Sequence, residues 1–191
     1  MIGAILAGGS GERLGARSKA ALTVAGRPLA AYPAAALEDV CEVVAIVCKP
    51  DTELPGLPGV ERWDEPAEPR HPLTGIVHAL EHAGEAVLVC AADMPFVTAD
   101  ACRSLVTSPA SAVAGEGPAA VVAIAGGVLQ PTFGLYTSAA LDGLRSADRD
   151  GSLTAAVEAL EPARVALPAA LVRSVNTPDD LAAAEAELSR R

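Results

Sequence analysis

The sequence predicts an α/β fold in which helices cover both faces of a mostly parallel sheet. Short apolar runs of strand length alternate with stretches of helical pattern along the chain. Most of these runs are continuously apolar, which is typical of strands that are buried on both faces. The chain has 191 residues with no internal repeat and no linker-like stretch, so we expect a single domain over residues 1–191.

The first buried strand is expected at residues 2–6, where an apolar run ends in a group of glycines. Pro28 suits the first turn of a helix that continues to about Glu38. Pro33 should kink this helix or delay its start, because proline lacks a backbone N–H. The next elements expected are strands at residues 43–47 and 60–63 and a helix at residues 73–83.

In the second half, a third clear strand is expected at residues 86–90, and Thr98 should cap the helix that follows it. The Gly126-Gly127 pair predicts a turn between two antiparallel strands. The final helix should begin at Pro178, which fits the first helical position. The remaining elements expected are helices at residues 138–144 and 152–160 and a last strand at residues 171–175.

The composition limits the partners of this chain. A net charge of −10 argues against nucleic acid, because phosphate backbones demand a basic surface. We expect no membrane span, because glycines and a proline interrupt the long uncharged stretch between Glu116 and Asp142. The N-terminal apolar run is too short for a signal peptide, and the four cysteines show no C-x-x-C spacing. These observations favour a cytoplasmic protein with buried free thiols.

The first nineteen residues predict a loop that binds a polyphosphate. A glycine-rich turn at Gly8 and Gly9 follows the first strand, and two cations follow at Arg13 and Lys19. Glycine lets backbone N–H groups approach an anion, and the cations balance its charge. The loop is not a Walker A sequence, because it contains no Gly-Lys pair, and Leu14 stands where the dinucleotide fingerprint needs a glycine.

Two carboxylates follow predicted strands at the same edge of the sheet. Asp64 ends the strand expected at residues 60–63, and Asp93 follows the strand expected at residues 86–90. Ligands of such sheets bind beyond the carboxyl ends of the strands, and a carboxylate fixed there can hold Mg²⁺ together with phosphate oxygens. The plainer interpretations are that Asp93 caps the next loop and that Asp64 is an ordinary loop residue.

The opening sequence resembles the signature L-A-G-G-x-x-x-R-[ML]-G-x-x-x-K of the molybdenum cofactor guanylyltransferases, the MobA-like NTP transferases. Three later segments are also similar to this family: D-M-P-F at Asp93, P-L-T-G at residues 72–75, and N-T-P-D-D-L at residues 176–181. A fourth is Q-P-T-F-G-L-Y at residues 130–136. The resemblance therefore covers nearly the whole chain. It implies a Rossmann-like three-layer nucleotidyltransferase fold.

The resemblance also implies an activity, a metal and a set of residues. The activity is transfer of GMP from GTP to the phosphate of molybdopterin with release of pyrophosphate, and the metal is Mg²⁺ on Asp93. The implied partners are GTP, a phosphorylated pterin and, transiently, molybdenum cofactor enzymes. The implied catalytic residues are Arg13, Lys19 and Asp93, and the implied nucleotide-binding residues are Leu6, Ala7, Gly8, Gly9, Lys19, Asp64 and Asp93.

Some alternatives stay open at this point. The family commonly carries an asparagine at the end of its second strand that helps to hold the base, whereas Ile46-Val47-Cys48-Lys49 has no amide. A cytidylyltransferase, a sugar-phosphate nucleotidyltransferase or a nucleotide sensor without turnover therefore remain possible. Asn176 can reach the metal or substrate, but a helix cap by Asn176 or Thr177 is the favoured interpretation.

A competing pattern lies in the helix expected at residues 73–83. His78, Glu81 and His82 match H-x-x-E-H, a zinc-binding helix of some peptidases, and the spacing places both imidazoles on one helix face. The sequence indicates no third ligand, so a solvated helix face is the favoured interpretation.

Overall fold

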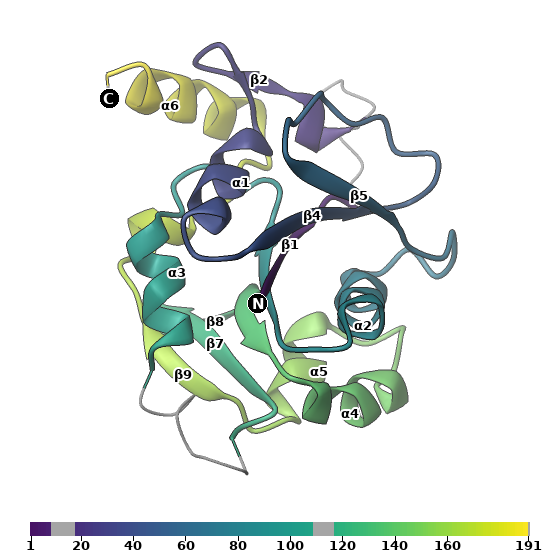
Figure 1. The fold of residues 1–191 in the computed structure, drawn as a ribbon. Helices are drawn as coiled ribbons and strands as arrows, with labels where there is room; N and C mark the ends of the chain where they lie inside the picture. The colour runs from purple at the N-terminus through teal and green to yellow at the C-terminus, as the bar shows by residue number, and fades with distance from the viewer. Residues whose placement is uncertain (9–17, 109–116, 191) are drawn as a thin grey trace.

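The computed structural model describes residues 1–8, 18–108 and 117–190 of the chain. Within these ranges a seven-stranded sheet has the order β5-β4-β1-β6-β8-β7-β9 (Figure 1). Strand β8 runs antiparallel to its neighbours β6 and β7, and the other pairs are parallel. The strands are β1 (Ile2–Leu6), β4 (Val43–Cys48), β5 (Val60–Asp64), β6 (Val87–Ala91), β7 (Ala120–Ala125), β8 (Val128–Tyr136) and β9 (Ala163–Ala166). The expected mostly parallel sheet with some antiparallel pairing is confirmed.

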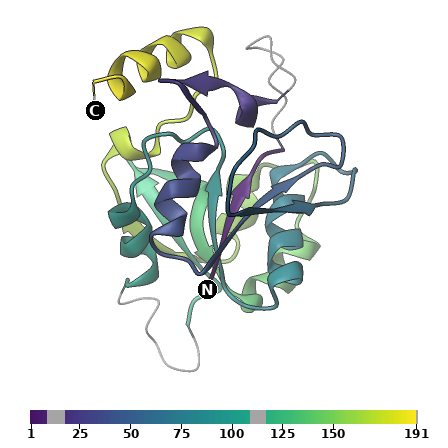
Figure 2. The same cartoon turned by 45° about the horizontal axis from the view of Figure 1, so that its top comes forward.

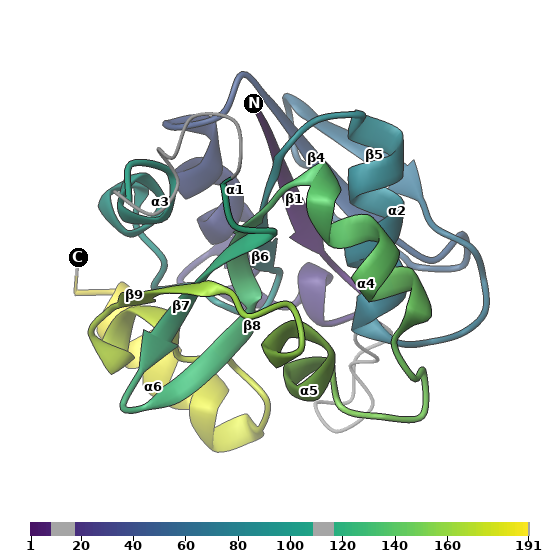
Figure 3. The same ribbon diagram turned by 90° about the horizontal axis from the view of Figure 1, so that it is seen from below.

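Helices cover both faces of the sheet (Figures 1 and 3). On one face α1 (Ala31–Glu38) and α3 (Ala99–Val106) contribute to one buried cluster of side chains. On the other face α2 (Pro72–Ala83), α4 (Leu141–Ser146) and α5 (Leu153–Glu158) contribute to a second cluster. None of the helices that the structure describes is long and apolar enough to cross a lipid bilayer.

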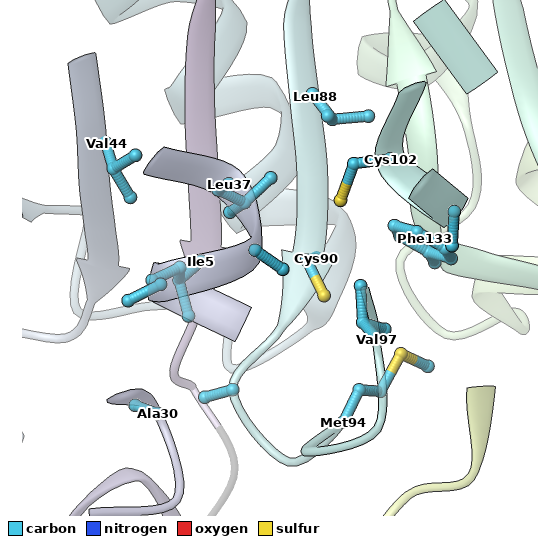
Figure 4. Close-up of a cluster of buried hydrophobic side chains, with 14 of the residues drawn as sticks. Ile5, Ala30, Leu37, Val44, Leu88, Cys90, Met94, Val97, Cys102 and Phe133 are labelled. Carbon is cyan, nitrogen blue, oxygen red and sulfur yellow. The ribbon is translucent and has the colours of Figure 1, made fainter. Parts of the chain in front are cut away.

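The two clusters arise because successive side chains of a strand point to opposite faces. In β1, Ala4 belongs to the cluster beneath α2, and Ile5 belongs to the cluster beneath α1 and α3. Figure 4 shows the cluster beneath α1 and α3, in which Leu37 of α1 lies between Ile5 and Leu88. All four cysteines of the chain are buried and free, which confirms the expectation of free thiols.

A smaller unit lies over one end of the sheet. A hairpin of β2 (Thr23–Val24) and β3 (Arg27–Pro28) packs beside the C-terminal helix α6 (Pro178–Leu188) (Figure 2). The hairpin follows the short 3₁₀ helix η2 (Lys19–Ala21). At its turn, the backbone N–H of Ala25 donates to Glu185 Oε2 of α6 over 2.6 Å. The C-terminal helix is thereby joined to the segment that carries Lys19.

The structure corrects several element bounds. Pro28 lies in β3 and not in a helix, and α1 begins only at Ala31, so Pro33 does sit in a delayed first turn. The helix expected at residues 138–144 begins with the 3₁₀ turn η4 (Ser138–Ala140). The helix expected at residues 152–160 is shorter than predicted and corresponds to α5.

The last strand was predicted wrongly. Residues 171–175 form no strand, since the 3₁₀ helix η5 (Ala169–Val172) occupies their first half. The strand is instead β9, which pairs in parallel with β7 at the edge of the sheet. Its sequence Ala-Arg-Val-Ala alternates between partly buried and exposed positions, so it lacks the continuous apolar run of a central strand. Strand β9 can be recognised only from its pairing with β7 in the structure.

Candidate functional site

A cavity of about 380 Å³ opens at the edge of the sheet where the parallel strands β1, β4 and β6 end. This is the edge at which doubly wound sheets bind their ligands. Leu6, Ala7 and Gly8 line the cavity, and the nucleotide contact expected of them stays a prediction. Its charged and polar lining residues are Lys19, Lys49, Glu65, Arg70, His71, Asp93, Thr132, Ser174 and Asn176.

At one end of the cavity, Lys19 joins two oxygen ligands from distant parts of the chain. Its Nζ lies 3.1 Å from Asp93 Oδ2 and 2.6 Å from Asn176 Oδ1. Asp93 follows β6, and its own carbonyl accepts a hydrogen bond from the Val175 N–H over 2.9 Å. This backbone bond holds the segment before α6 against the end of β6. The structure therefore brings the predicted Lys19 and Asp93 together and adds Asn176 to them.

Asn176 is the residue whose favoured interpretation was wrong. Thr177, and not Asn176, caps α6, because its side chain accepts from the Asp180 N–H over 3.1 Å. Asp180 completes a capping box by accepting from the Thr177 N–H over 2.8 Å. The Asn176 side chain is therefore free of the cap and points to Lys19. The sequence allowed Asn176 either to cap α6 or to reach the site. Because Thr177 caps the helix, the Asn176 side chain is left to contact Lys19.

Asp93 and Asn176 fit the requirements of a Mg²⁺ site. Both offer oxygen, the ligand type that Mg²⁺ prefers, and their oxygens already converge on one cation, the Lys19 ammonium. The described residues contain no group of three or more His, Cys, Asp or Glu side chains that could enclose a metal. With two protein oxygens as ligands, a Mg²⁺ ion would complete its shell with water and phosphate oxygens.

At the other end of the cavity, Lys49 and Glu65 form a buried pair that sequence reasoning missed. The Lys49 ammonium lies 3.5 Å from Glu65 Oε1 and donates to the carbonyls of Pro66 and Pro69 over 2.6 and 2.9 Å. The Glu65 side chain is only 4% exposed, and burial raises the pKa of its carboxyl, although Lys49 opposes this shift. The available signal was a charge directly after each of two strands, of which only β4 is apolar throughout.

Asp64 does not line this cavity. It lies at the end of β5, half exposed, with its Oδ1 2.7 Å from Arg62 Nε. Glu65, the next residue, lines the cavity instead, because neighbouring side chains along an extended segment point to opposite sides. The nucleotide contact expected of Asp64 stays a prediction. Arg13 and Gly9, two further predicted residues, lie outside the described residues.

The histidines have packing and capping roles in the described structure. His71 caps α2: its Nδ1 accepts from the Leu73 N–H over 3.2 Å, so its Nε2 carries the proton that it shares with the Gly151 carbonyl. The His82 ring stacks on Trp63 with 4.3 Å between ring centroids. His78 lies next to it, and burial is the main cause that lowers its pKa. Glu81 and His82 are exposed and His78 is partly buried, which agrees with the solvated helix face favoured from the sequence.

Comparison with known proteins identifies the family. The model of the MobA-like NTP transferase domain matches residues 3–165. The chain belongs to the MobA-like NTP transferase family. A molybdenum cofactor guanylyltransferase of Cereibacter sphaeroides is 34% identical over 198 residues, which cover 100% of this chain and 98% of that protein.

Solved structures of the family and of related enzymes share the fold. Molybdopterin-guanine dinucleotide biosynthesis protein A from Archaeoglobus fulgidus matches with a TM-score of 0.76 and 25% identity, covering 100% of both chains. The 2-C-methyl-D-erythritol 4-phosphate cytidylyltransferase from Thermus thermophilus matches with a TM-score of 0.72 and 24% identity, again over 100% of both chains. The nucleotidyltransferase fold expected from the sequence is thereby confirmed, and the chain is a nucleotidyltransferase of this family.

Proposed function

We propose that this chain transfers GMP from GTP to the terminal phosphate of molybdopterin and releases pyrophosphate. The observation that carries the proposal is the convergence of Lys19, Asp93 and Asn176 beside the backbone of β1 in one cavity. The relatives that are 33% to 34% identical over the whole chain are named molybdenum cofactor guanylyltransferases, which supports GTP as the donor. Molybdopterin as acceptor, Mg²⁺ as cofactor and delivery of the product to molybdenum cofactor enzymes are parts of the same proposal.

The chemistry is an in-line displacement at phosphorus. An oxygen of the acceptor phosphate forms a bond to the α-phosphorus of GTP, while the bond from that phosphorus to the α–β bridging oxygen breaks. Pyrophosphate leaves with the electron pair. No covalent enzyme intermediate is required, so the protein contributes positioning and stabilisation of charge.

The residues of the cavity divide this work. The Lys19 ammonium would neutralise charge that develops on the transferring phosphate. It lies beside the side-chain oxygens of Asp93 and Asn176, where the phosphate would be bound. Asp93 and Asn176 would hold Mg²⁺, which offsets the negative charge of the triphosphate when bound. The backbone of Leu6, Ala7 and Gly8 would line the base and ribose. Ala7 is fixed for this role by a hydrogen bond of 2.9 Å from its N–H to the Val47 carbonyl.

Pyrophosphate release with GTP, CTP, ATP and UTP, each with Mg²⁺ and with or without molybdopterin, tests this proposal. We expect release only with GTP and only when molybdopterin is present. Release with CTP alone would instead establish a cytidylyltransferase, the alternative that fits the fold shared with the Thermus thermophilus enzyme. If the protein binds a nucleotide but releases no pyrophosphate with any phosphate acceptor, an enzymatic role is contradicted.

A further inference from the structure

The bond between Lys19 Nζ and Asn176 Oδ1 joins two distant segments of the chain and is exposed to solvent. Water competes for the donors and acceptors of an exposed hydrogen bond, so this bond does little to align its own partners. Lys19 begins η2, which leads into the β2-β3 hairpin, and Asn176 directly precedes the Thr177 cap of α6. The alignment of Lys19 with Asn176 therefore depends on how the hairpin and α6 are held together.

A small buried cluster packs the hairpin, the loop after Asp93 and α6 against one another. Its members come from β2, from the residue after β3, from the Asp93 loop, and from the start and middle of the α6 segment: Val24, Leu29, Phe96, Val175 and Ala184. The backbone also ties η2 to the hairpin, because the Leu29 N–H donates to the Leu22 carbonyl over 2.6 Å. A movement of the hairpin relative to α6 would therefore move Lys19 relative to Asn176.

Glu185 of α6 holds the turn of this hairpin. Its Oε2 accepts a hydrogen bond from the Ala25 N–H over 2.6 Å, where the hairpin lies beside α6 (Figure 2). The turn is unfavourable by itself, because Ala25 has a φ of 47°, a left-handed conformation that alanine rarely adopts. A carboxylate is a stronger acceptor than a neutral group, so Glu185 both stabilises the turn and fixes it to the helix.

The hairpin has a second contact that serves a different purpose. The Tyr32 hydroxyl donates to the Val24 carbonyl over 2.7 Å, which joins the hairpin to α1 on the sheet. The Glu185 bond instead joins the hairpin to the helix that begins beside Asn176. Two bonds thus connect residues 19–25 with residues 176–185, one at each end of the two segments.

We propose that Glu185 is a positioning residue that keeps Lys19 aligned with Asn176 for the transfer reaction. This inference rests on the proposed function and adds to it a residue outside the cavity. Loss of the Glu185 bond leaves the exposed bond between Lys19 and Asn176 to align the two segments. A misplacement of about 1 Å can cost about a hundredfold in rate, so even a partial loss of alignment is measurable.

A first test reads the position of Lys19 without any substrate. The only lysines of the chain are Lys19 and Lys49, so an NMR spectrum of isotope-labelled lysine side chains resolves them. In Glu185→Ala the Lys19 signal should move toward that of a solvated lysine, while the buried Lys49 keeps its signal. Glu81→Ala removes a matched glutamate, which joins α2 to Arg145 of α4 over 2.8 Å, and should leave the Lys19 signal unchanged. An unchanged Lys19 signal in Glu185→Ala would overturn the proposal.

A second test measures steady-state pyrophosphate release. Glu185→Ala should lower kcat about tenfold, the order of one hydrogen bond to a charged group, and keep the KM for GTP within about twofold of normal. Glu185→Gln should restore most of the rate, because its amide oxygen still accepts from the Ala25 N–H. In an Asn176→Ala background, Glu185→Ala should lower kcat by less than about twofold more, since the contact to be aligned is already gone. A full tenfold loss in that background would overturn the proposal, because Glu185 would then act by another route.

The two proposals fail in different ways. If the unaltered protein releases no pyrophosphate with any nucleotide and acceptor, the proposed transfer is wrong, and the Lys19 signal still decides whether Glu185 aligns the pair. If the unaltered protein is active and Glu185→Ala keeps kcat within about twofold of normal, only the positioning role is wrong.

Discussion

Replacement of Lys19 by methionine removes the ammonium that joins Asp93 and Asn176 in the cavity. Two unit charges 3.1 Å apart interact by about 5 kcal/mol at an effective dielectric constant of about 20. If roughly half a unit of negative charge develops on the transferring phosphate at a similar distance, the lysine stabilises the transition state by about 2.7 kcal/mol. This corresponds to a loss of about a hundredfold in kcat.

The assay is steady-state pyrophosphate release at saturating GTP and molybdopterin, with the melting temperature of each variant recorded. Lys19→Met should lower kcat at least about a hundredfold. Arg103→Met, which removes an exposed cation of α3, should leave kcat unchanged. A Lys19→Met variant with kcat within about threefold of normal would refute the charge-stabilisation reasoning, because no charge of this size could then be acting at the reacting phosphate.

Three further predictions concern the same cavity. Asp93→Ala should lower pyrophosphate release at least about a hundredfold and raise the Mg²⁺ concentration needed for half-maximal rate; near-normal release would remove Asp93 from the metal site. Asn176→Ala should lower kcat with little change in melting temperature, whereas Thr177→Ala, which removes the α6 cap, should lower the free energy of unfolding by about 1 kcal/mol and leave kcat intact; the reverse pattern would contradict the assignment of these neighbours. Because burial raises the pKa of Glu65, its ionisation opposes folding, so the stability tied to its protonation is present below its ordinary pKa and lost as the pH rises through the folded value. The melting temperature of the unaltered protein relative to that of Glu65→Gln should therefore fall as the pH rises from about 4 to about 7, and a difference that is independent of pH would contradict the shift.

Local sequence signals predicted the centre of the fold well. The strand β6 is a continuous apolar run and Asp93 lies two residues after its end, so both the strand and the position of the carboxylate were readable from the chain. The same holds for Lys19, because the glycine-rich opening and its cations have a fixed spacing. These features depend on residues that are neighbours in the sequence.

The missed features depend on contacts between distant residues. Whether Asp64 or Glu65 faces the cavity depends on where β5 ends relative to β4, and a shift of one residue exchanges the two side chains. The role of Asn176 was hidden because Thr177 could fill the cap equally well, and only the proximity of Lys19 shows which residue is free. The edge strand β9 is visible only through its partner β7.

The bond between the Val175 N–H and the Asp93 carbonyl has a consequence for shortened forms of this enzyme. The family match ends at residue 165, and all seven strands of the sheet in the described ranges end by residue 166. A chain truncated soon after residue 166 would keep its sheet. It would lose the Asn176 side-chain oxygen and the contact by which α6 holds the hairpin that follows Lys19. Boundaries for expression, tags and fusions are therefore best placed beyond Leu188, where α6 ends.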